Sequence, residues 1–336
     1  MNKINDNALS LHKNSIIVDM LNPSKITRDY LLSMKKSGIT ASNITLAGAK
    51  HGDVAHIRNT PSDVIDDLTR FNKFINDNND IAIPIRCSAD IEKAKSEGKV
   101  GIINGFQNSL PIREDLSLVK IYYNLGVRII QLTYNEKNLV GGGCGDTSNS
   151  PLSEFGKMVV KEMNDLGILI DLSHVGDNTS LDAINFSKKS VAFTHANARA
   201  LCNNPRNKPD SLIKLISSKG GIIGLVPISM FVTKNDPNVT IDSLLNHANY
   251  MKKLVGSNYM GFGTDFMEGW TPEEVNSLLE VFPWEKNKVV NYVTELNSVT
   301  KLPNLTTSLM KNGYDNNEIQ KIMGLNFLDL FKKVCD

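Results

Sequence analysis

The sequence has few of the features that stabilise small secreted domains or mark nucleic-acid binding. Its 336 residues contain only four cysteines, with no CxxC pair and no zinc-finger spacing: Cys87, Cys144, Cys202 and Cys335. We therefore expect a reducing compartment and no disulfide framework. Lys and Arg total 37 against 36 Asp and Glu, a net charge of +1 with no basic run. This balance argues against a nucleic-acid partner.

Long apolar runs are also lacking. Near the N-terminus the longest is Ile16–Val18, far shorter than a signal peptide or a membrane span. The sequence thus predicts a cytoplasmic protein with no membrane partner. Its hydrophobic content of 41% and charged content of 22% are ordinary for a globular chain. A chain of this length can bury a core without disulfides or a structural metal.

What the chain does contain is a regular alternation of short apolar runs and amphipathic stretches. Continuous apolar runs are typical of parallel strands that are buried on both faces. The predicted strands are Ser15–Met20, Ile39–Leu46, Val100–Asn104, Val127–Thr133, Ile168–Leu172, Val191–Thr194, Gly221–Val226 and Tyr259–Gly263. The predicted helices between them are Ser62–Ile75, Leu116–Leu125, Leu152–Leu166, Leu181–Ser187, Ser211–Ser218 and Ile241–Val255.

Eight strands separated by helices predict an α/β fold, a (β/α)8 TIM barrel. A doubly wound sheet is the alternative, but the Gly-x-Gly-x-x-Gly turn after the first strand is absent. No linker or repeat divides the chain, so we predict a single domain, 1–336. Within it, residues 270–302 are predicted to form an inserted excursion and residues 303–334 extra C-terminal closing helices.

In such a barrel, catalytic side chains stand at the carboxyl ends of the strands. His174 follows the fifth predicted strand and His195 the sixth. Imidazoles on neighbouring strand ends can converge on one point, which is half of a metal site. Each histidine alone is more often structural, but their adjacency favours a functional role. Asp265 ends the eighth strand and could orient a water, accept a proton or cap a helix.

Other polar residues lie in the predicted loops above the barrel. Arg206 suits a substrate carboxylate, because its fork of donors matches two oxygens; the plainer alternative is a surface ion pair with Asp210. Cys144 lies in a glycine-rich stretch and is either an activated thiol or an inert residue of a lid. Tyr134 and Asn135 precede that stretch and are predicted to line the pocket.

Several motifs occur together in the order and spacing of one known family. They are Asp171-Leu172-Ser173-His174-Val175, Thr194-His195, Pro205-Arg206-Asn207-x-Pro209-Asp210, Gly220-Gly221 and Gly261-Phe262-Gly263-x-Asp265-Phe266. From Ile17 to Phe331 the chain therefore resembles the renal (membrane) dipeptidase family. The resemblance implies an amidohydrolase-like barrel, a homodimer, and hydrolysis of small dipeptides by a water that two zinc ions activate.

The sequence departs from this family at most of the metal ligands. The family's first strand ends in a His and an Asp that bind zinc, where this chain has Leu21 and Pro23. We align Asn104 with the family's bridging Glu and Tyr134 with a pocket His. Leu and Pro side chains offer no donor atom. The resemblance thus predicts a degenerate site in which two ligands remain and hold one zinc or similar divalent ion, or no metal: His174 and His195.

The resemblance also assigns roles to the retained residues. Catalysis is assigned to Asp265, His174 and His195. Binding of a small carboxylate-bearing substrate is assigned to Arg206, with Tyr134, Asn135 and Asn104 lining the pocket.

The leading hypothesis for function is a dipeptidase-like hydrolase of a small amide, dipeptide or amino-acid derivative. Two alternatives stay open. One is a non-catalytic homologue that binds a small zwitterion or a partner. The other is a metal-free enzyme in which Cys144 is the nucleophile.

Overall fold

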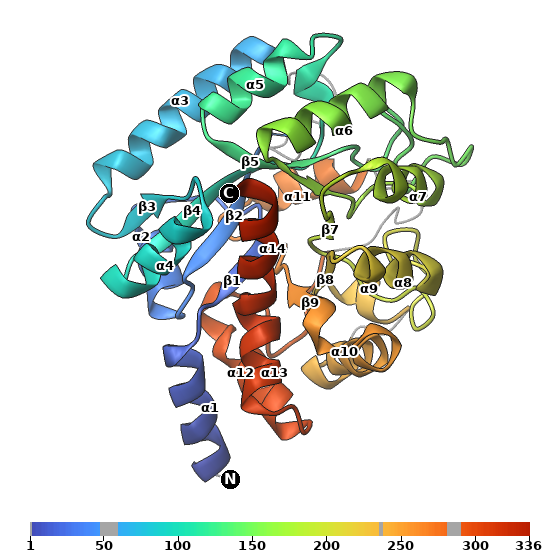
Figure 1. The fold of residues 1–336 in the computed structure, drawn as a ribbon. Helices are drawn as coiled ribbons and strands as arrows, with labels where there is room; N and C mark the ends of the chain where they lie inside the picture. Colours follow the sequence, from blue (N-terminus) through green and yellow to red (C-terminus); the bar gives the residue numbers. More distant parts are fainter. Residues whose placement is uncertain (1, 48–59, 235–237, 281–289) are drawn as a thin grey trace.

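Eight parallel strands form a nearly closed barrel (Figure 1), which confirms the predicted fold class. The structure is a computed structural model and describes residues 2–47, 60–234, 238–280 and 290–336. The barrel strands are β1 (Val18–Asn22), β2 (Ala41–Ala47), β4 (Val100–Phe106), β5 (Val127–Gln131), β6 (Leu169–Asp171), β7 (Ala192–Phe193), β8 (Ile222–Leu225) and β9 (Met260–Phe262). A short strand, β3 (Ala82–Pro84), pairs with the first half of β4.

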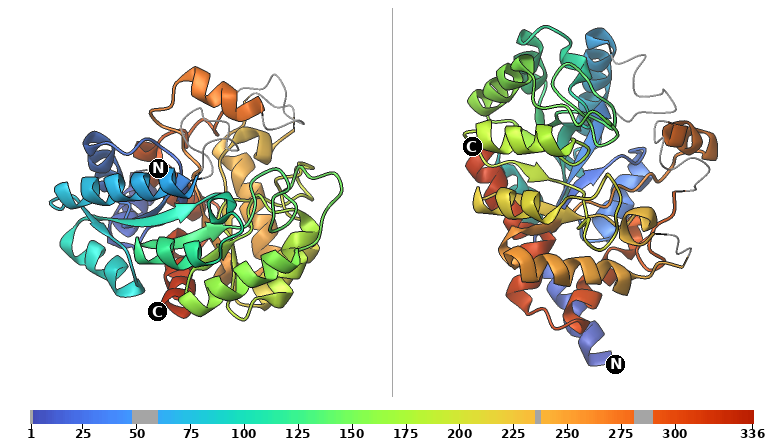
Figure 2. Two further views of the ribbon diagram at one scale, coloured as in Figure 1. Left: turned by 90° about the horizontal axis from the view of Figure 1, so that it is seen from above. Right: turned by 90° about the vertical axis from the view of Figure 1, so that its right-hand side faces the viewer.

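Helices surround the ring of strands (Figure 2), and every predicted helix is present. Those after β3 are α4 (Ser88–Glu97), α5 (Ser117–Asn124), α6 (Glu154–Leu166), α7 (Asp177–Phe186), α8 (Asp210–Ser218), α9 (Ser229–Val232), α10 (Ile241–Val255), α11 (Pro272–Glu280), α12 (Pro303–Lys311), α13 (Asn316–Gln320) and α14 (Asn326–Cys335). Before β3 lie α1 (Asn2–Asn14), α2 (Arg28–Lys36) and α3 (Pro61–Asp77). Shorter helical turns are η1 (Leu110–Ile112), η2 (Ser257–Tyr259), η3 (Val299–Lys301) and η4 (Lys321–Leu325).

None of the helices in the described ranges is long and apolar enough to span a bilayer. The predicted excursion, residues 270–302, holds α11 and η3, and its residues 281–289 lie outside the described part. The structure adds α1, α2, α4 and α9 to the predicted helices.

The buried apolar residues form two clusters. The larger fills the layer between the strands and the surrounding helices. The second fills the lumen of the barrel, where Val18, Ile103 and Leu169 meet Phe327 and Phe331 of α14. In Figure 1, α14 lies across the middle of the ring of strands. Apolar packing thus closes one end of the barrel and leaves polar chemistry to the carboxyl ends of the strands.

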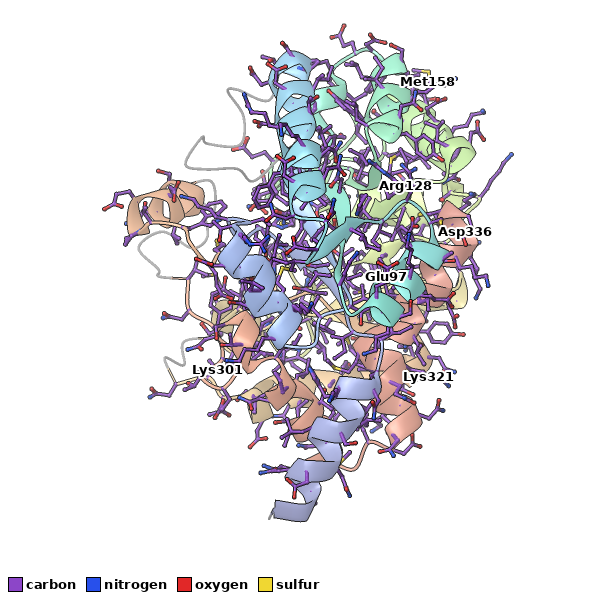
Figure 3. The ribbon with its side chains drawn as sticks, turned by 90° about the vertical axis from the view of Figure 1, so that its left-hand side faces the viewer. Glu97, Arg128, Met158, Lys301, Lys321 and Asp336 are labelled. Atoms are coloured by element: carbon purple, nitrogen blue, oxygen red, sulfur yellow. The ribbon has the colours of Figure 1, made fainter. Side chains whose placement is uncertain are left out.

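The end of α14 is tied to α4 at that closed end. The backbone N–H of Ser88 donates to Asp336 at 2.8 Å, and the Ser88 hydroxyl donates to the other carboxylate oxygen. Figure 3 labels Asp336, which makes this contact, and Glu97, the last residue of α4. Because Ser88 begins α4, a carboxylate here also suits the positive end of that helix dipole.

Closure of the barrel between β1 and β9 depends on Asp19. Its carboxylate accepts from the backbone N–H of Thr264 at 2.8 Å and from the Thr264 hydroxyl at 2.6 Å. The Leu21 carbonyl in turn accepts from the N–H of Asp265 at 3.0 Å. Asp19 is fully buried, and this burial raises its pKa to about 7. The Asp19 carboxylate and one backbone bond therefore join the ends of the first and last strands.

We predict that Asp19→Ala lowers the free energy of unfolding by about 2–4 kcal/mol, because the N–H and hydroxyl of Thr264 lose their buried acceptor. Urea unfolding followed by circular dichroism measures the change. The control is Asp29→Ala on α2, where the side chain is exposed. Equal unfolding midpoints for the two variants would contradict the closing role of Asp19.

Candidate functional site

The two histidines predicted at neighbouring strand ends do come together. His174 follows β6 and His195 follows β7, and their Nε2 atoms lie 3.1 Å apart. Both side chains are buried. Burial, and after it the Arg206 guanidinium, lower the pKa of both imidazoles well below the usual value. Both rings are therefore neutral at neutral pH.

The tautomer of His195 is set by a second buried carboxylate. The Thr194 hydroxyl donates to Asp171 at 2.6 Å and lies 2.7 Å from His195 Nδ1. Since that hydroxyl has given its proton to Asp171, it accepts from His195 Nδ1. The Nε2 atom of His195 is then left with its lone pair.

A matching arrangement orients His174. Its Nδ1 lies 2.7 Å from the side-chain oxygen of Asn135, which accepts the proton. The ring of Tyr134 stacks on the imidazole at 4.1 Å between centroids and 19° between planes. His174 Nε2 therefore also carries a lone pair, and it faces that of His195. The predicted pocket residues Tyr134 and Asn135 thus contact His174 directly.

Two lone pairs that face each other at 3.1 Å fit a single divalent ion. Zinc–imidazole bonds of about 2.0–2.1 Å can reach both atoms from one point between them. A second ion finds less support. The positions at the end of β1 to which the resemblance assigns metal ligands hold Leu21 and Pro23. No group of three or more His, Cys, Asp or Glu in the described ranges is placed to hold a metal. The residues present fit one ion.

Arg206 is fully buried and contacts the strand ends that carry the histidines. Its guanidinium donates to the carbonyl of Ser173 and, at 2.9 Å, to that of His195. The Arg206 Nε atom has no hydrogen-bond partner among the described residues. Two of the donors that the sequence assigns to a substrate carboxylate are thus engaged by the backbone, and Nε remains for a ligand.

Lys208 is a second buried cation, which sequence reasoning missed. Its Nζ donates to the carbonyl of Val175 at 2.7 Å and lies 4.9 Å from the centre of the Phe193 ring. Burial, and then Arg206, lower its pKa to about 7. Lys208 lies at the variable position of the Pro-Arg-Asn-x-Pro motif, so the motif gives no signal for it. Its burial is what identifies it as a candidate functional residue.

Asp265 has the geometry of a functional residue. Its backbone is left-handed, with φ of 52°, which is strained for a non-glycine residue. The N–H is held by Leu21, and the carbonyl accepts from the Tyr292 hydroxyl at 2.7 Å. Burial raises the pKa of its carboxyl to about 6, although Arg206 opposes the shift. Asp265 is therefore a carboxylate able to exchange a proton near neutral pH.

The structure does not bring Asn104 to the histidines. Its side chain faces the helix layer and donates to Asn72 of α3 at 2.9 Å. The strand extends to Phe106, two residues beyond the predicted end, and Gln107 follows it. The Gln107 amide nitrogen lies 3.4 Å from His195 Nε2, and its oxygen has no partner in the described structure. Gln107 thus has the place that we predicted for Asn104.

Cys144 lies beside the histidines but is not activated. Its thiol donates to Asn135 at 3.3 Å, and burial raises its pKa. A Cβ on the preceding Gly143 would lie 2.2 Å from the Tyr134 carbonyl. The glycines therefore serve close packing of the backbone, which counts against a nucleophile on a lid.

Comparison with known proteins agrees with this architecture. A family model described as membrane dipeptidase (peptidase family M19) matches residues 6–281. The dipeptidase tcpJ of Claviceps purpurea is 27% identical over 251 residues, 74% of this chain and 54% of that protein. An uncharacterized dipeptidase of Schizosaccharomyces pombe, C965.12, is 29% identical over 266 residues, 76% of this chain and 58% of that protein. The chain thus spans little more than half the length of these relatives.

A solved structure matches along the whole chain. An amidohydrolase from Pseudomonas aeruginosa superposes with a TM-score of 0.88 at 35% identity. The match covers 97% of this chain and 98% of that one.

We predict that iodoacetamide alkylates Cys144 slowly at about pH 7.5, with a rate that still rises above pH 9, because only the thiolate reacts and burial raises the Cys144 pKa. Mass spectrometry of peptides follows the rate, with Cys87, which is partly exposed like Cys144, as the internal control. Faster labelling of Cys144 than of Cys87 at neutral pH would support the hypothesis that Cys144 is a nucleophile.

Proposed function

This chain belongs to the membrane dipeptidase family, and on that premise we propose that it hydrolyses the amide bond of a small amino-acid derivative or dipeptide with a single divalent ion. The facing Nε2 atoms of His174 and His195 carry the proposal. Two neutral imidazoles held 3.1 Å apart by fixed Nδ1 partners repel each other unless a cation or a donor lies between them.

Each retained residue has a place in this chemistry. His174 and His195 would hold the divalent ion, which would lower the pKa of a bound water enough for attack at neutral pH. Asp171 and Asn135 hold the two imidazoles in the tautomers that such an ion needs. Asp265 accepts a proton in its carboxylate form and returns it to the leaving amine. Arg206 positions both histidines and offers Nε to an anionic end of the substrate.

A mechanism with two ions has less support. Neutral side chains stand at Leu21, Pro23 and Gln107, so the carboxylates that would offset the repulsion of two cations are missing there. The proposal is therefore a mononuclear site, with the degenerate ligand set that the sequence predicts.

A non-catalytic binding protein is the second candidate, and Arg206 favours it. Two of its guanidinium donors are engaged by carbonyl groups, an arrangement that would stabilise a fixed binding site with or without turnover. Such a protein would bind a small zwitterion without changing it.

We predict close to one zinc per chain after supplementation, and loss of that zinc in His174→Ala, because one of the two imidazole ligands is removed. Elemental analysis of untagged protein gives the ratio. His247→Gln is the control, since in the described structure that ring hydrogen-bonds to backbone groups of Ala198 and Val232. Two zinc ions per chain would restore a binuclear mechanism. Absence of zinc would contradict the single-ion site and favour the binding protein.

We also predict that kcat/KM falls tenfold per pH unit below about pH 6, since the raised pKa of Asp265 means that its carboxyl is protonated there and cannot accept a proton. Asp265→Asn should remove this limb and lower kcat by about 100-fold. A pH profile on the best substrate of a dipeptide panel measures both. A wild-type rate that stays flat down to pH 5 would contradict the role.

A further inference from the structure

A cavity of about 310 Å³ lies beside the segment that follows β1, at Pro23. Pro23 and the residues after it form one wall, and the end of β2 forms another. The remaining walls come from α3 and from Trp270, just before α11. In Figure 3, α11 stands at the edge of the molecule on the side of α3. The cavity is close to the lower limit of volume for a ligand pocket.

The lining of this cavity is aromatic and apolar, with balanced charge at its rim. Phe71, Phe74 and Trp270 are the aromatic residues, and Ile44 and Leu46 are among the aliphatic ones. The charged side chains at the rim are paired within the protein: Lys25 with Glu274 at 2.8 Å and Arg70 with Asp67 at 2.6 Å. Such a lining favours an uncharged apolar group over an ion.

One polar atom of the cavity wall is left for a ligand. Thr45 is 6% exposed, lines the cavity, and its hydroxyl has no hydrogen-bond partner in the described part of the chain. A buried hydroxyl without a partner is costly, so a ligand with a polar atom beside its apolar group gains from filling the cavity.

The same loops that form the cavity also hold Asp265. The Leu21 carbonyl accepts from the Asp265 N–H, and Pro23 follows two residues later. The Trp270 indole N–H donates to the Pro23 carbonyl at 2.9 Å, which fixes the aromatic wall to the β1 loop. The cavity is therefore built onto the strand end that borders the proton-exchanging carboxyl group.

We propose that this cavity is a subsite for an aromatic or branched aliphatic side chain of the ligand, with Thr45 bonding a polar atom at the base of that side chain. The inference rests on the proposed function, because it takes the ligand to be the amino-acid derivative that reaches Asp265. In this chain, apolar recognition occupies the strand end that carries metal ligands in the family it belongs to.

The test is a fluorescence titration, which needs neither metal nor turnover. The sequence has two tryptophans, so Trp284→Phe leaves Trp270 as the single reporter. The probes are L-phenylalaninamide and glycinamide, which differ only by a benzyl group. We expect L-phenylalaninamide to change the Trp270 emission saturably and to bind at least 10-fold more tightly than glycinamide.

Two variants locate the effect. Phe71→Ala should weaken L-phenylalaninamide at least fivefold with little change for glycinamide, and Thr45→Val should weaken both probes. Phe186→Ala on α7 removes an exposed phenylalanine and should change neither affinity. Melting temperatures confirm that each variant folds.

Equal affinity for the two probes, or an unchanged preference in Phe71→Ala, would overturn the subsite. Failure of the proposed function gives a different result. If the protein holds no zinc and turns over no substrate but still prefers L-phenylalaninamide, the subsite is supported as part of a binding protein. Hydrolysis that is indifferent to side-chain size would retain the function and reject the subsite.

Discussion

The candidate site depends on a buried guanidinium, that of Arg206, which has no carboxylate partner among the described residues. Arg206 donates to the carbonyl groups of Ser173 and His195, which belong to adjacent strand ends. The ladder between β6 and β7 has the single pair Asp171–Ala192, and Asp171 and Ser173 add side-chain bonds to Thr194 and His195. Arg206 adds to the bonds that hold the two imidazoles in contact at 3.1 Å. Hydrogen bonds to the two carbonyl groups offset the cost of burying the Arg206 charge. The positive charge of Arg206 also lowers the affinity of the two imidazoles for protons.

Sequence reasoning reaches the barrel and the histidine pair because both follow from simple rules. Runs such as Val127–Thr133 are apolar throughout, and parallel strands buried on both faces have this composition. His174 and His195 directly follow two such runs, and the carboxyl ends of parallel strands share one edge. These inferences need no knowledge of side-chain contacts.

The error at Asn104 shows where sequence reasoning stops. Side chains alternate along a strand, so a displacement of one position reverses the face. The predicted strand ended at Asn104, whereas β4 continues to Phe106, and the residue that meets His195 is Gln107. The sequence points to Arg206 but not to its burial, and it gives no sign of Lys208, for another reason. Full burial of a loop cation depends on the tertiary path of that loop, and no periodicity in the sequence encodes it.

Asp19 and Asp171 each join two neighbouring strand ends of the barrel with the same set of hydrogen bonds. Each carboxylate accepts from the N–H two residues later and from the N–H and hydroxyl of a threonine on the neighbouring strand, Thr264 or Thr194. Neither carboxylate is a candidate ligand, yet each lies within three residues of positions that are. Side chains at the neighbouring positions can therefore differ while Asp19 and Asp171 keep the hydrogen bonds that join the strands. In a barrel built in this way, a substitution at a reactive position leaves the hydrogen bonds that hold the strands together intact.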